Sequence, residues 1–275
     1  MNRTPRVWFI TGTSSGLGAA FAHAALECGD RVAATVRQSD DAGLLRARFG
    51  DGVLPLLLDV RDRDAVFRSV AEAATHFGQL DVVVNNAGYG LAGAVEEVVE
   101  ADAREQLDVN FFGSLWVIQA ALPYLRSRQS GHIIQVSSMG GVFAYPTMGM
   151  YHASKWAVEG MAEALRAEVA GFGIKVTLLQ PGSHETGARN RLAGSPRLAS
   201  YSELHDRVVG NRPRRPPGDP SRAARALLQL LEIPDPPMRL PLGSDAVVAI
   251  RAALVKRAAD HDRWDDLART TDRPD

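Results

Sequence analysis

The chain has 275 residues, of which 45% are hydrophobic and 23% charged, so it can bury a substantial core and is not intrinsically disordered. Its formal net charge of −1 gives no reason to expect binding to nucleic acid or to an anionic membrane surface. The single cysteine, Cys28, excludes an intramolecular disulfide and suits a reducing compartment, and we expect it to pack against a helix rather than bind metal.

Short apolar runs alternate with longer helical stretches, beginning with "RVWFIT" at residues 6–11. No run reaches the roughly 18–20 apolar residues that a membrane span needs. The first run leads directly into a glycine motif rather than a signal-peptide cleavage site, so we expect a cytoplasmic protein. The expected strands are, in chain order, residues 6–11, 31–36, 53–60, 80–86, 131–138 and 174–181.

The stretches between these strands have the length and pattern of helices. Because the strands are apolar throughout rather than alternating, they suit a parallel sheet covered by helices on both faces. The alternation predicts an α/β fold with a doubly wound parallel sheet, a Rossmann fold, which binds its ligand beyond the carboxyl ends of the strands. The expected helices are residues 17–28, 40–49, 62–77, 101–126 and 150–171.

Beyond Pro181 the pattern loosens into a stretch rich in glycine, arginine and proline. We predict one Rossmann-type domain over residues 1–275, with a substrate lid at about 183–220. The elements expected after the lid region are a helix at 221–232, a short strand at 238–243, a helix at 245–259 and a charged, partly mobile tail at 258–275.

The first strand ends in "TGTSSGLG", residues 11–18, which places three glycines between a strand and a helix. A glycine turn there lets backbone N–H groups approach a pyrophosphate, and the helix N-terminus adds partial positive charge. This context makes the signal stronger than a glycine triplet alone, although a tight turn without a ligand is the alternative. The residues expected to hold the cofactor phosphates are Gly12, Thr13, Ser14, Ser15, Gly16, Leu17 and Gly18.

The end of the second strand distinguishes NADP from NAD. NAD-binding folds usually place an acid there to bind the ribose 2′-hydroxyl, whereas this chain has Val36 followed by Arg37. Arginine can pair with a 2′-phosphate that a carboxylate would repel, so we predict NADP (NADPH), with a solvated surface charge as the alternative for Arg37. We expect Asp40 and Asp41 to cap the next helix rather than to bind ribose.

Two further strand ends add expected cofactor contacts. Asp59 can accept a hydrogen bond from an adenine amino group, although a strand-end aspartate can equally cap a turn. "NNAG", residues 85–88, has small residues that let the backbone lie close to a flat ligand. The expected contacts are Asp59, Val60, Asn86, Ala87 and Gly88.

"YHASK", residues 151–155, places a tyrosine and a lysine four positions apart, on one face of a helix. Reduction of a ketone needs a proton donor and a group that stabilises the developing negative charge. An unperturbed tyrosine has a pKa of about 10, which a nearby ammonium lowers. We predict catalysis by Tyr151 and Lys155 with Ser138, which ends the fifth strand. The alternative for the pair is an ordinary surface helix.

Six motifs occur in the order seen in short-chain dehydrogenases/reductases, which the chain resembles from about residue 5 to residue 186. The glycine spacing is similar to that of the single-domain oxidoreductase branch. "NNAGYGLAGAVEEV" and "LPLGSDA" are similar to the 17β-hydroxysteroid-dehydrogenase-like subgroup. The six motifs are "TGTSSGLG", "NNAG", Asn110 in "DVNFFG", Ser138 in "VSSMGG", "YHASK" and "PGSHET".

The resemblance implies roles and partners. Tyr151 would be the acid in reduction and the base in oxidation, and Lys155 would hold the nicotinamide ribose and lower the pKa of the tyrosine. Ser138 would bind the substrate oxygen. Asn110 would mark a helix irregularity that holds a water, although a helix asparagine bonded to its neighbours is the alternative. A homodimer or homotetramer is also implied. The residues that would frame the nicotinamide are Pro181, Gly182 and Thr186.

The segment 139–150 joins Ser138 to Tyr151 and should wall the substrate pocket with apolar side chains. We therefore predict a hydrophobic ketone or aldehyde and its alcohol, although the lid arginines Arg189, Arg191 and Arg197 could instead bind an acidic tail. His132 should be solvated, and His152 should serve packing or lie at the surface. The expected substrate contacts are Ser138, Tyr145, Met148, Tyr151 and His184, the last of which could equally be a loop residue without a role.

The sequence thus predicts an NADP(H)-dependent oxidoreductase that acts on a carbonyl/alcohol pair. One alternative is an NAD-preferring dehydrogenase of the same fold, and another is a dinucleotide-sensing binding protein without turnover. The scattered histidines show no metal-ligand spacing, so no metal site is expected.

Overall fold

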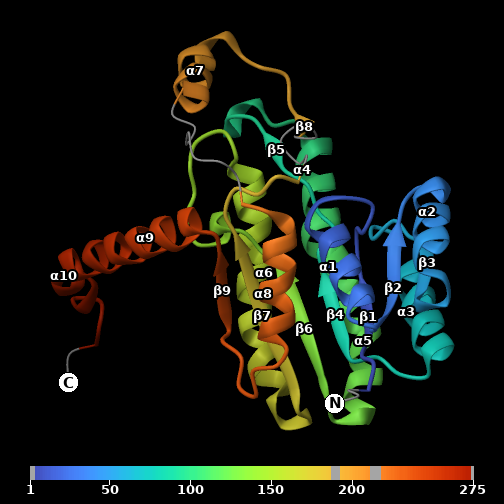
Figure 1. Ribbon diagram of the computed structural model, residues 1–275. Helices are drawn as coiled ribbons and strands as arrows, with labels where there is room; N and C mark the ends of the chain where they lie inside the picture. The colour runs from blue at the N-terminus through green and yellow to red at the C-terminus, as the bar shows by residue number, and fades with distance from the viewer. Residues whose placement is uncertain (1–3, 187–192, 211–217, 274–275) are drawn as a thin grey trace.

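The computed structural model describes residues 4–186, 193–210 and 218–273. In this part of the chain, a parallel sheet of seven strands in the order β3-β2-β1-β4-β6-β7-β9 lies between two layers of helices (Figure 1). This is the doubly wound Rossmann arrangement predicted from the sequence. The strands are β1 (Val7–Ile10), β2 (Arg31–Val36), β3 (Val53–Leu57), β4 (Val82–Asn85), β6 (Gly131–Val136), β7 (Ile174–Pro181) and β9 (Arg239–Leu242).

The helices fall close to the ranges expected from the sequence, except that the long helix at 101–126 is divided in two. A second, small sheet pairs β5 (Leu91–Ala92) with β8 (Ala193–Gly194). The helices are α1 (Gly16–Glu27), α2 (Ser39–Phe49), α3 (Arg63–Phe77), α4 (Glu100–Leu107), α5 (Gly113–Arg128), α6 (Gly149–Val169), α7 (Ser202–Gly210), α8 (Pro220–Leu230), α9 (Ser244–Arg263) and α10 (Asp265–Arg269).

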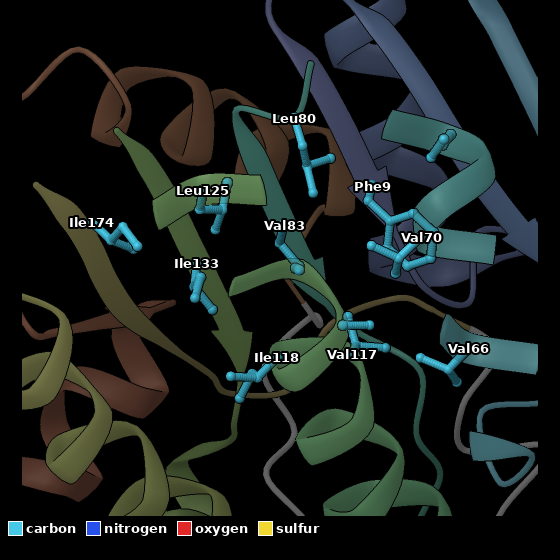
Figure 2. Packing of buried hydrophobic residues seen from close by; sticks show 14 of the residues in the cluster. Phe9, Val66, Val70, Leu80, Val83, Val117, Ile118, Leu125, Ile133 and Ile174 are labelled. Carbon is cyan, nitrogen blue, oxygen red and sulfur yellow. The ribbon is translucent and has the colours of Figure 1, made fainter. Parts of the chain in front are cut away.

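The core has two halves, one on each face of the sheet, and successive strand residues alternate between them. Ile133 packs with helices α3, α5 and α6, whereas Ile134 packs with α1, α2 and α8. Leu178 and Leu179 divide in the same way. Figure 2 shows part of the first half, in which Ile133 and its neighbours from α3 and α5 meet. Burial on both faces explains why most positions of the strands are apolar rather than every second one.

The strand order reverses between β1 and β4, which lie side by side in the sheet. From this point the chain builds β2 and β3 on one side and β6, β7 and β9 on the other. In an open parallel sheet, ligands bind at such a reversal, outside the carboxyl ends of the strands. The glycine motif follows β1 and "NNAG" follows β4, so the fold brings both motifs to the same place.

Three minor predictions were wrong. Cys28 is exposed, because α1 ends at Glu27 and Cys28 follows at its open end. The residue that precedes α2 is Gln38, so Asp40 and Asp41 lie in the first turn and do not cap it. In that turn their negative charges still interact favourably with the partial positive charge of the helix N-terminus.

The third wrong prediction concerns His132, which is 5% exposed rather than solvated. Its Nε2 lies 3.0 Å from the Thr177 Oγ1. That hydroxyl donates its proton to the Pro237 carbonyl, so it accepts one from the histidine. Burial lowers the pKa of His132 to about 3, and the ring is therefore neutral.

The charged tail is largely helical in the described residues: α9 extends to Arg263, α10 spans Asp265–Arg269, and the described part ends at Arg273. Figure 1 shows these helices extending away from the sheet. Of the predicted lid, residues 187–192 and 211–217 lie outside the described residues, and with them Arg189 and Arg191.

Candidate active site

The glycine loop between β1 and α1 is built so that side chains are absent where the backbone turns. Gly12 and Gly16 have φ angles of +70° and +64°, a region that favours glycine. A Cβ on Gly18 would overlap the Gly12 carbonyl and the Asn86 amide. The first turn of α1 contains no acidic residue, so nothing opposes its partial positive charge. This cradle fits the pyrophosphate of a dinucleotide.

The loop is held by the "NNAG" segment of the neighbouring strand. The Asn86 Nδ2 donates to the carbonyls of Thr11 and Gly12 at 2.9 and 3.1 Å. In return, the Thr11 Oγ1 accepts from the N–H groups of Asn86 and Ala87, both at 2.9 Å. Sequence analysis did not single out Thr11. Its position at the end of a buried strand, directly before the glycine loop, was the available signal.

Three charged side chains lie at the ends of β2 and β3. Arg37 is exposed, and its charge helps to lower the pKa of Asp59. The main cause of that lowering is Arg61, whose Nη2 and Nε donate to the Asp59 carboxylate at 2.6 and 3.0 Å. Arg61 also contacts Glu105 at 2.8 Å. Sequence analysis missed Arg61, a second arginine beside the expected adenine end of the cofactor.

The predicted catalytic residues meet where β6 ends and α6 begins. The hydroxyls of Ser138 and Tyr151 share a hydrogen bond, and the Ser138 Oγ also accepts from the Gly140 N–H at 3.1 Å. The Lys155 Nζ lies 5.9 Å from the centroid of the Tyr151 ring and donates to the Val136 carbonyl at 2.9 Å. The surface-helix alternative for this pair is wrong, because Lys155 is buried.

The two titratable groups are shifted toward their neutral forms. Burial raises the pKa of Tyr151 to about 12, although the hydrogen bond from Ser138 lowers it. Burial lowers the pKa of Lys155 to about 8, although Glu159 raises it. In the protein alone Lys155 therefore does not lower the pKa of Tyr151 below its usual value, because the cost of desolvating the phenolate is larger. The phenol is held as a proton donor at neutral pH.

Asn110 lies in the π-helical segment Asp108–Phe112 that separates α4 from α5, so the irregularity implied by the resemblance is present. Its Nδ2 donates to the Tyr89 carbonyl and to the Ser154 Oγ, both at 3.0 Å. Its Oδ1 accepts from the Tyr89 N–H at 3.1 Å. Asn110 thereby joins the loop after "NNAG" to α6, next to Lys155. Single-turn π-segments of this kind are frequent at functional sites.

Comparison with known proteins decides the family. The short chain dehydrogenase family matches residues 6–195. The chain is also 42% identical over 273 residues to "Oxidoreductase BOA17" of Botryotinia fuckeliana (strain B05.10), covering 96% of this chain and 98% of that protein. The chain belongs to the short-chain dehydrogenase/reductase family. As a member of this family, it is an oxidoreductase.

Other members are similar over most of their length. A 3-ketodihydrosphingosine reductase of Bacteroides thetaiotaomicron is 37% identical over 245 residues, covering 87% of this chain and 88% of that protein. A short-chain dehydrogenase from Streptomyces avermitilis has a TM-score of 0.89 at 35% identity, covering 99% of this chain and 100% of that one.

Two solved structures hold a nicotinamide dinucleotide. A short chain dehydrogenase from Burkholderia cenocepacia in complex with NADP has a TM-score of 0.75 at 29% identity, covering 96% of this chain and 98% of that chain. One from Burkholderia phymatum in complex with NAD has a TM-score of 0.80 at 22% identity, covering 98% and 97%, and shows the fold alone. The first of these structures, at 29% identity, supports a nicotinamide dinucleotide as the cofactor of this family member.

Some residues expected to touch the cofactor support the site through packing. The Thr13 Oγ1 donates to the Thr35 carbonyl at 3.0 Å and is buried. Val60 is buried against Gly113, where a Cβ would lie 2.7 Å from its Cγ2. In a short-chain dehydrogenase/reductase, such residues place the strand ends against which the ligand binds. Their direct contact with the cofactor stays a prediction.

The loop after β7 is held by the C-terminal segment. The Gly182 N–H donates to the Leu242 carbonyl at 2.9 Å, and the Ser183 N–H donates to the Asp245 Oδ2 at 2.8 Å. A Cβ on Gly182 would overlap the Asp245 carboxylate. Pro181, which ends β7, is buried. Sequence analysis missed Asp245, although it lies within the quoted "LPLGSDA" motif.

Thr186 and His184 contact different parts of the molecule in this loop. The Thr186 Cβ lies 3.1 Å from where a Cβ on Gly16 would be, so this residue adjoins the glycine loop, and its contact with the nicotinamide stays a prediction. The His184 Nδ1 lies 3.3 Å from the Gly182 carbonyl oxygen. Its Cδ2 lies 2.9 Å from where a Cβ on Gly218 would be. The histidine therefore packs against the segment before α8, and its contact with substrate stays a prediction.

The described part of the lid rests on the segment after β5. The buried Glu97 carboxylate accepts from the N–H groups of Ala94 and Leu198, at 2.7 and 2.9 Å. It also accepts from the His205 Nε2 at 2.8 Å. Burial by itself would raise the pKa of Glu97, but the two N–H groups and His205 hold that pKa below its usual value.

Two further contacts reinforce this attachment. The Ser195 Oγ donates to Asp102 and the Tyr201 hydroxyl donates to Glu96, both at 2.7 Å. Within the described residues, no group of three or more His, Cys, Asp or Glu side chains could hold a metal ion. In the same residues, no helix is long and apolar enough to cross a bilayer.

Proposed function

We propose that the protein is an NADP(H)-dependent reductase that interconverts a hydrophobic ketone or aldehyde and its alcohol. The observation that carries the proposal is the cluster of the half-buried Ser138 and Tyr151 with the buried Lys155 at the carboxyl edge of the sheet, next to the glycine loop. A family relative whose name is 3-ketodihydrosphingosine reductase supports a ketone as substrate.

The residues fit a nicotinamide dinucleotide. The turn from Gly12 to Gly18 would hold its pyrophosphate, and Lys155 would bind the nicotinamide ribose. Pro181, Gly182 and Thr186 would border the nicotinamide. When bound, the reduced nicotinamide supplies the hydride.

The chain's own residues bind the carbonyl oxygen and deliver its proton. The hydroxyls of Ser138 and Tyr151 both donate hydrogen bonds to this oxygen when substrate is present, and so stabilise the negative charge that develops there. Tyr151 then transfers its proton to the oxygen. The raised pKa of Tyr151, about 12, keeps this proton in place until the oxygen becomes basic. The reverse reaction requires the phenolate, which Lys155 would stabilise in its charged form.

The wall of the pocket supports an apolar substrate. Val142 is buried, Phe143 and Met148 are partly buried, and Tyr145 is 38% exposed on the segment that follows Ser138. The substrate contacts of Tyr145, Met148 and His184 belong to this proposal, as does the resemblance to the 17β-hydroxysteroid-dehydrogenase-like subgroup. A homodimer or homotetramer is proposed on the family resemblance, and a cytoplasmic location on the single cysteine and the short apolar runs of the sequence.

A panel of apolar ketones and aldehydes tests the activity. The purified protein should oxidise NADPH with at least one of them, as followed by the absorbance of the reduced cofactor. Binding of NADPH without oxidation by any carbonyl, and without reduction of NADP by any alcohol, would instead support the alternative of a dinucleotide-sensing protein.

Arg37 should determine the choice of cofactor. Replacing it with alanine should weaken NADPH binding by roughly tenfold to a hundredfold, because a charge-assisted hydrogen bond to the 2′-phosphate is lost. NADH binding should stay the same. Fluorescence titration of both reduced cofactors measures the two dissociation constants.

The matched control is Arg46→Ala, an exposed arginine in the last turn of α2. It should change neither constant. An unchanged preference in Arg37→Ala, or a native protein that binds NADH more tightly than NADPH, would favour the NAD-preferring alternative.

Glu97 should hold the lid closed over the pocket. In Glu97→Gln, the amide has one acceptor oxygen and no charge for the three donors that contact the carboxylate, the N–H groups of Ala94 and Leu198 and the His205 Nε2. Because the attachment of the lid is weakened, we expect faster proteolysis in residues 193–210. The KM for the carbonyl should rise about tenfold, as expected for the loss of a buried charged hydrogen bond. Limited proteolysis and steady-state kinetics measure the two effects.

Glu100→Gln is the control. Among the described residues, the side chain of this exposed glutamate forms its hydrogen bond and ion pair with Arg104 alone. If Glu97→Gln were cleaved and saturated with substrate like this control, the segment would not act as a lid.

A further inference from the structure

His152 is a buried histidine that the proposed chemistry does not use. It lies in the first turn of α6, and only 2% of it is exposed. Both ring nitrogens have partners in the loop that joins Ser138 to α6. The Nδ1 lies 2.9 Å from the Gly140 carbonyl oxygen, and the Nε2 accepts from the Tyr145 N–H at 3.3 Å.

These partners fix the tautomer of the ring. A carbonyl oxygen can only accept, so Nδ1 carries the proton and donates it to Gly140. A backbone N–H can only donate, so Nε2 is unprotonated and accepts from Tyr145. Burial lowers the pKa of His152, although the bond to the Gly140 carbonyl raises it. The neutral ring is therefore the form that makes both contacts.

On its Nδ1 side, the ring reaches the catalytic hydroxyl through one residue. The Gly140 N–H donates to the Ser138 Oγ at 3.1 Å, and that hydroxyl shares a hydrogen bond with Tyr151. A Cβ on Gly140 would lie 2.7 Å from the His152 Cε1, so the turn lies directly against the ring. The Nδ1–H thus holds the turn that orients Ser138.

On its Nε2 side, the ring contacts Tyr145, which lies in the segment proposed to wall the substrate pocket. The Tyr145 ring meets the His152 ring edge to face, with centroids 4.4 Å apart and planes at 80°. The hydrogen bond to the Tyr145 N–H fixes the backbone behind the same side chain. Tyr145 is the exposed aromatic residue of the wall.

We propose that His152 is a positioning residue with two separable duties in the reaction. Its Nδ1–H orients Ser138 through Gly140 and so supports turnover, and its Nε2 positions Tyr145 and so sets affinity for the carbonyl substrate. The meaning of these two kinetic effects rests on the proposed carbonyl reductase activity.

Two amide variants separate the duties. In His152→Asn, the side-chain amide places an N–H near the position of Nδ1 and nothing near Nε2. In His152→Gln, the longer amide places an oxygen near the position of Nε2 and no donor near Nδ1. His261→Asn, an exposed histidine of α9, is the control.

The expected results are opposite for the two variants. His152→Asn should keep kcat and raise the KM for the carbonyl about tenfold. His152→Gln should lower kcat about tenfold and keep the KM for the carbonyl. Each change is the size expected for the loss of one hydrogen bond. The dissociation constant for NADPH should stay the same in both. Equal effects of the two variants, or effects no larger than those of the control, would overturn the proposal.

Hydrogen exchange tests the geometry without any activity. With amide-resolved mass spectrometry, the Tyr145 N–H should exchange faster in His152→Asn only, and the Gly140 N–H faster in His152→Gln only. If the native protein reduced no carbonyl but the amides exchanged in this pattern, the proposed function would be wrong. The contacts of His152 with Gly140 and Tyr145 would still be confirmed. Uniform acceleration across residues 139–148 in both variants would show a merely structural role and contradict the proposal.

Discussion

Tyr151→Phe should reduce kcat by about 10²–10⁴-fold, the range that a general acid contributes. Phenylalanine keeps the ring, which meets the His152 ring edge to face, and removes only the hydroxyl that donates the proton. The Ser138 hydroxyl remains to bind the carbonyl oxygen. Binding of NADPH should therefore persist with little change. Steady-state rates with a responsive carbonyl, together with a fluorescence titration of NADPH, measure both quantities.

Tyr124→Phe is the matched control, because this residue lies on α5, in the half of the core that Ile133 shares, away from Ser138 and Lys155. It should have native kinetics. If Tyr151→Phe turned over at the rate of this control, the phenol would not be the proton donor. If it lost NADPH binding as well, the loss of turnover would no longer report on proton transfer.

Gly18→Ala should abolish measurable NADPH binding. The new Cβ would overlap the Gly12 carbonyl and the Asn86 amide, and a backbone atom cannot move aside as the end of a flexible side chain can. The glycine turn must therefore open. Overpacking of this kind typically costs about 1–3 kcal/mol of stability. Thermal unfolding and cofactor titration measure the two effects.

Gly160→Ala provides the opposite expectation within the same protein. Gly160 lies inside α6 with φ in the helical range, and nothing lies within 4 Å of a Cβ added there. Alanine should stabilise the protein by about 0.5–1 kcal/mol, because it reduces the entropy lost on folding.

Native NADPH binding in Gly18→Ala would show that the loop does not form the cradle described here.

The sheet was predictable because the apolar composition of its strands indicates that they are buried. All four residues of β1 are apolar and buried, and the glycine loop and "NNAG" follow neighbouring strands that the reversal of strand order brings together. The local spacing of "YHASK" also placed Tyr151 and Lys155 on one face of a helix. Periodicity and strand-end chemistry were sufficient for these features.

Features that depend on contacts between distant segments were not predictable in this way. His132 is buried because Thr177 and Pro237 offer it a partner from the neighbouring strand and the segment before β9. Asp245 holds the loop after β7 across a separation of more than 60 residues. The pKa of Tyr151 also depends on burial, which one turn of helix cannot reveal.

The role of His152 illustrates the same limit. Its position about 100° round the helix from Tyr151 argued for packing or surface exposure rather than direct catalysis, and the ring is buried. However, the two ring contacts arise only when the segment 139–148 folds back over the start of α6. A sequence pattern gives no reason to expect that loop to fold onto a particular ring.

Transfer of deuterium from NADPH labelled at the transferring carbon of the nicotinamide tests the central claim most directly. With a carbonyl that the native protein reduces, mass spectrometry of the alcohol should find the label on the former carbonyl carbon. The Tyr151→Phe variant should bind the labelled cofactor with native affinity and form almost no labelled alcohol. Labelled alcohol formed at the native rate by that variant would contradict a reaction in which hydride transfer depends on the proton of Tyr151.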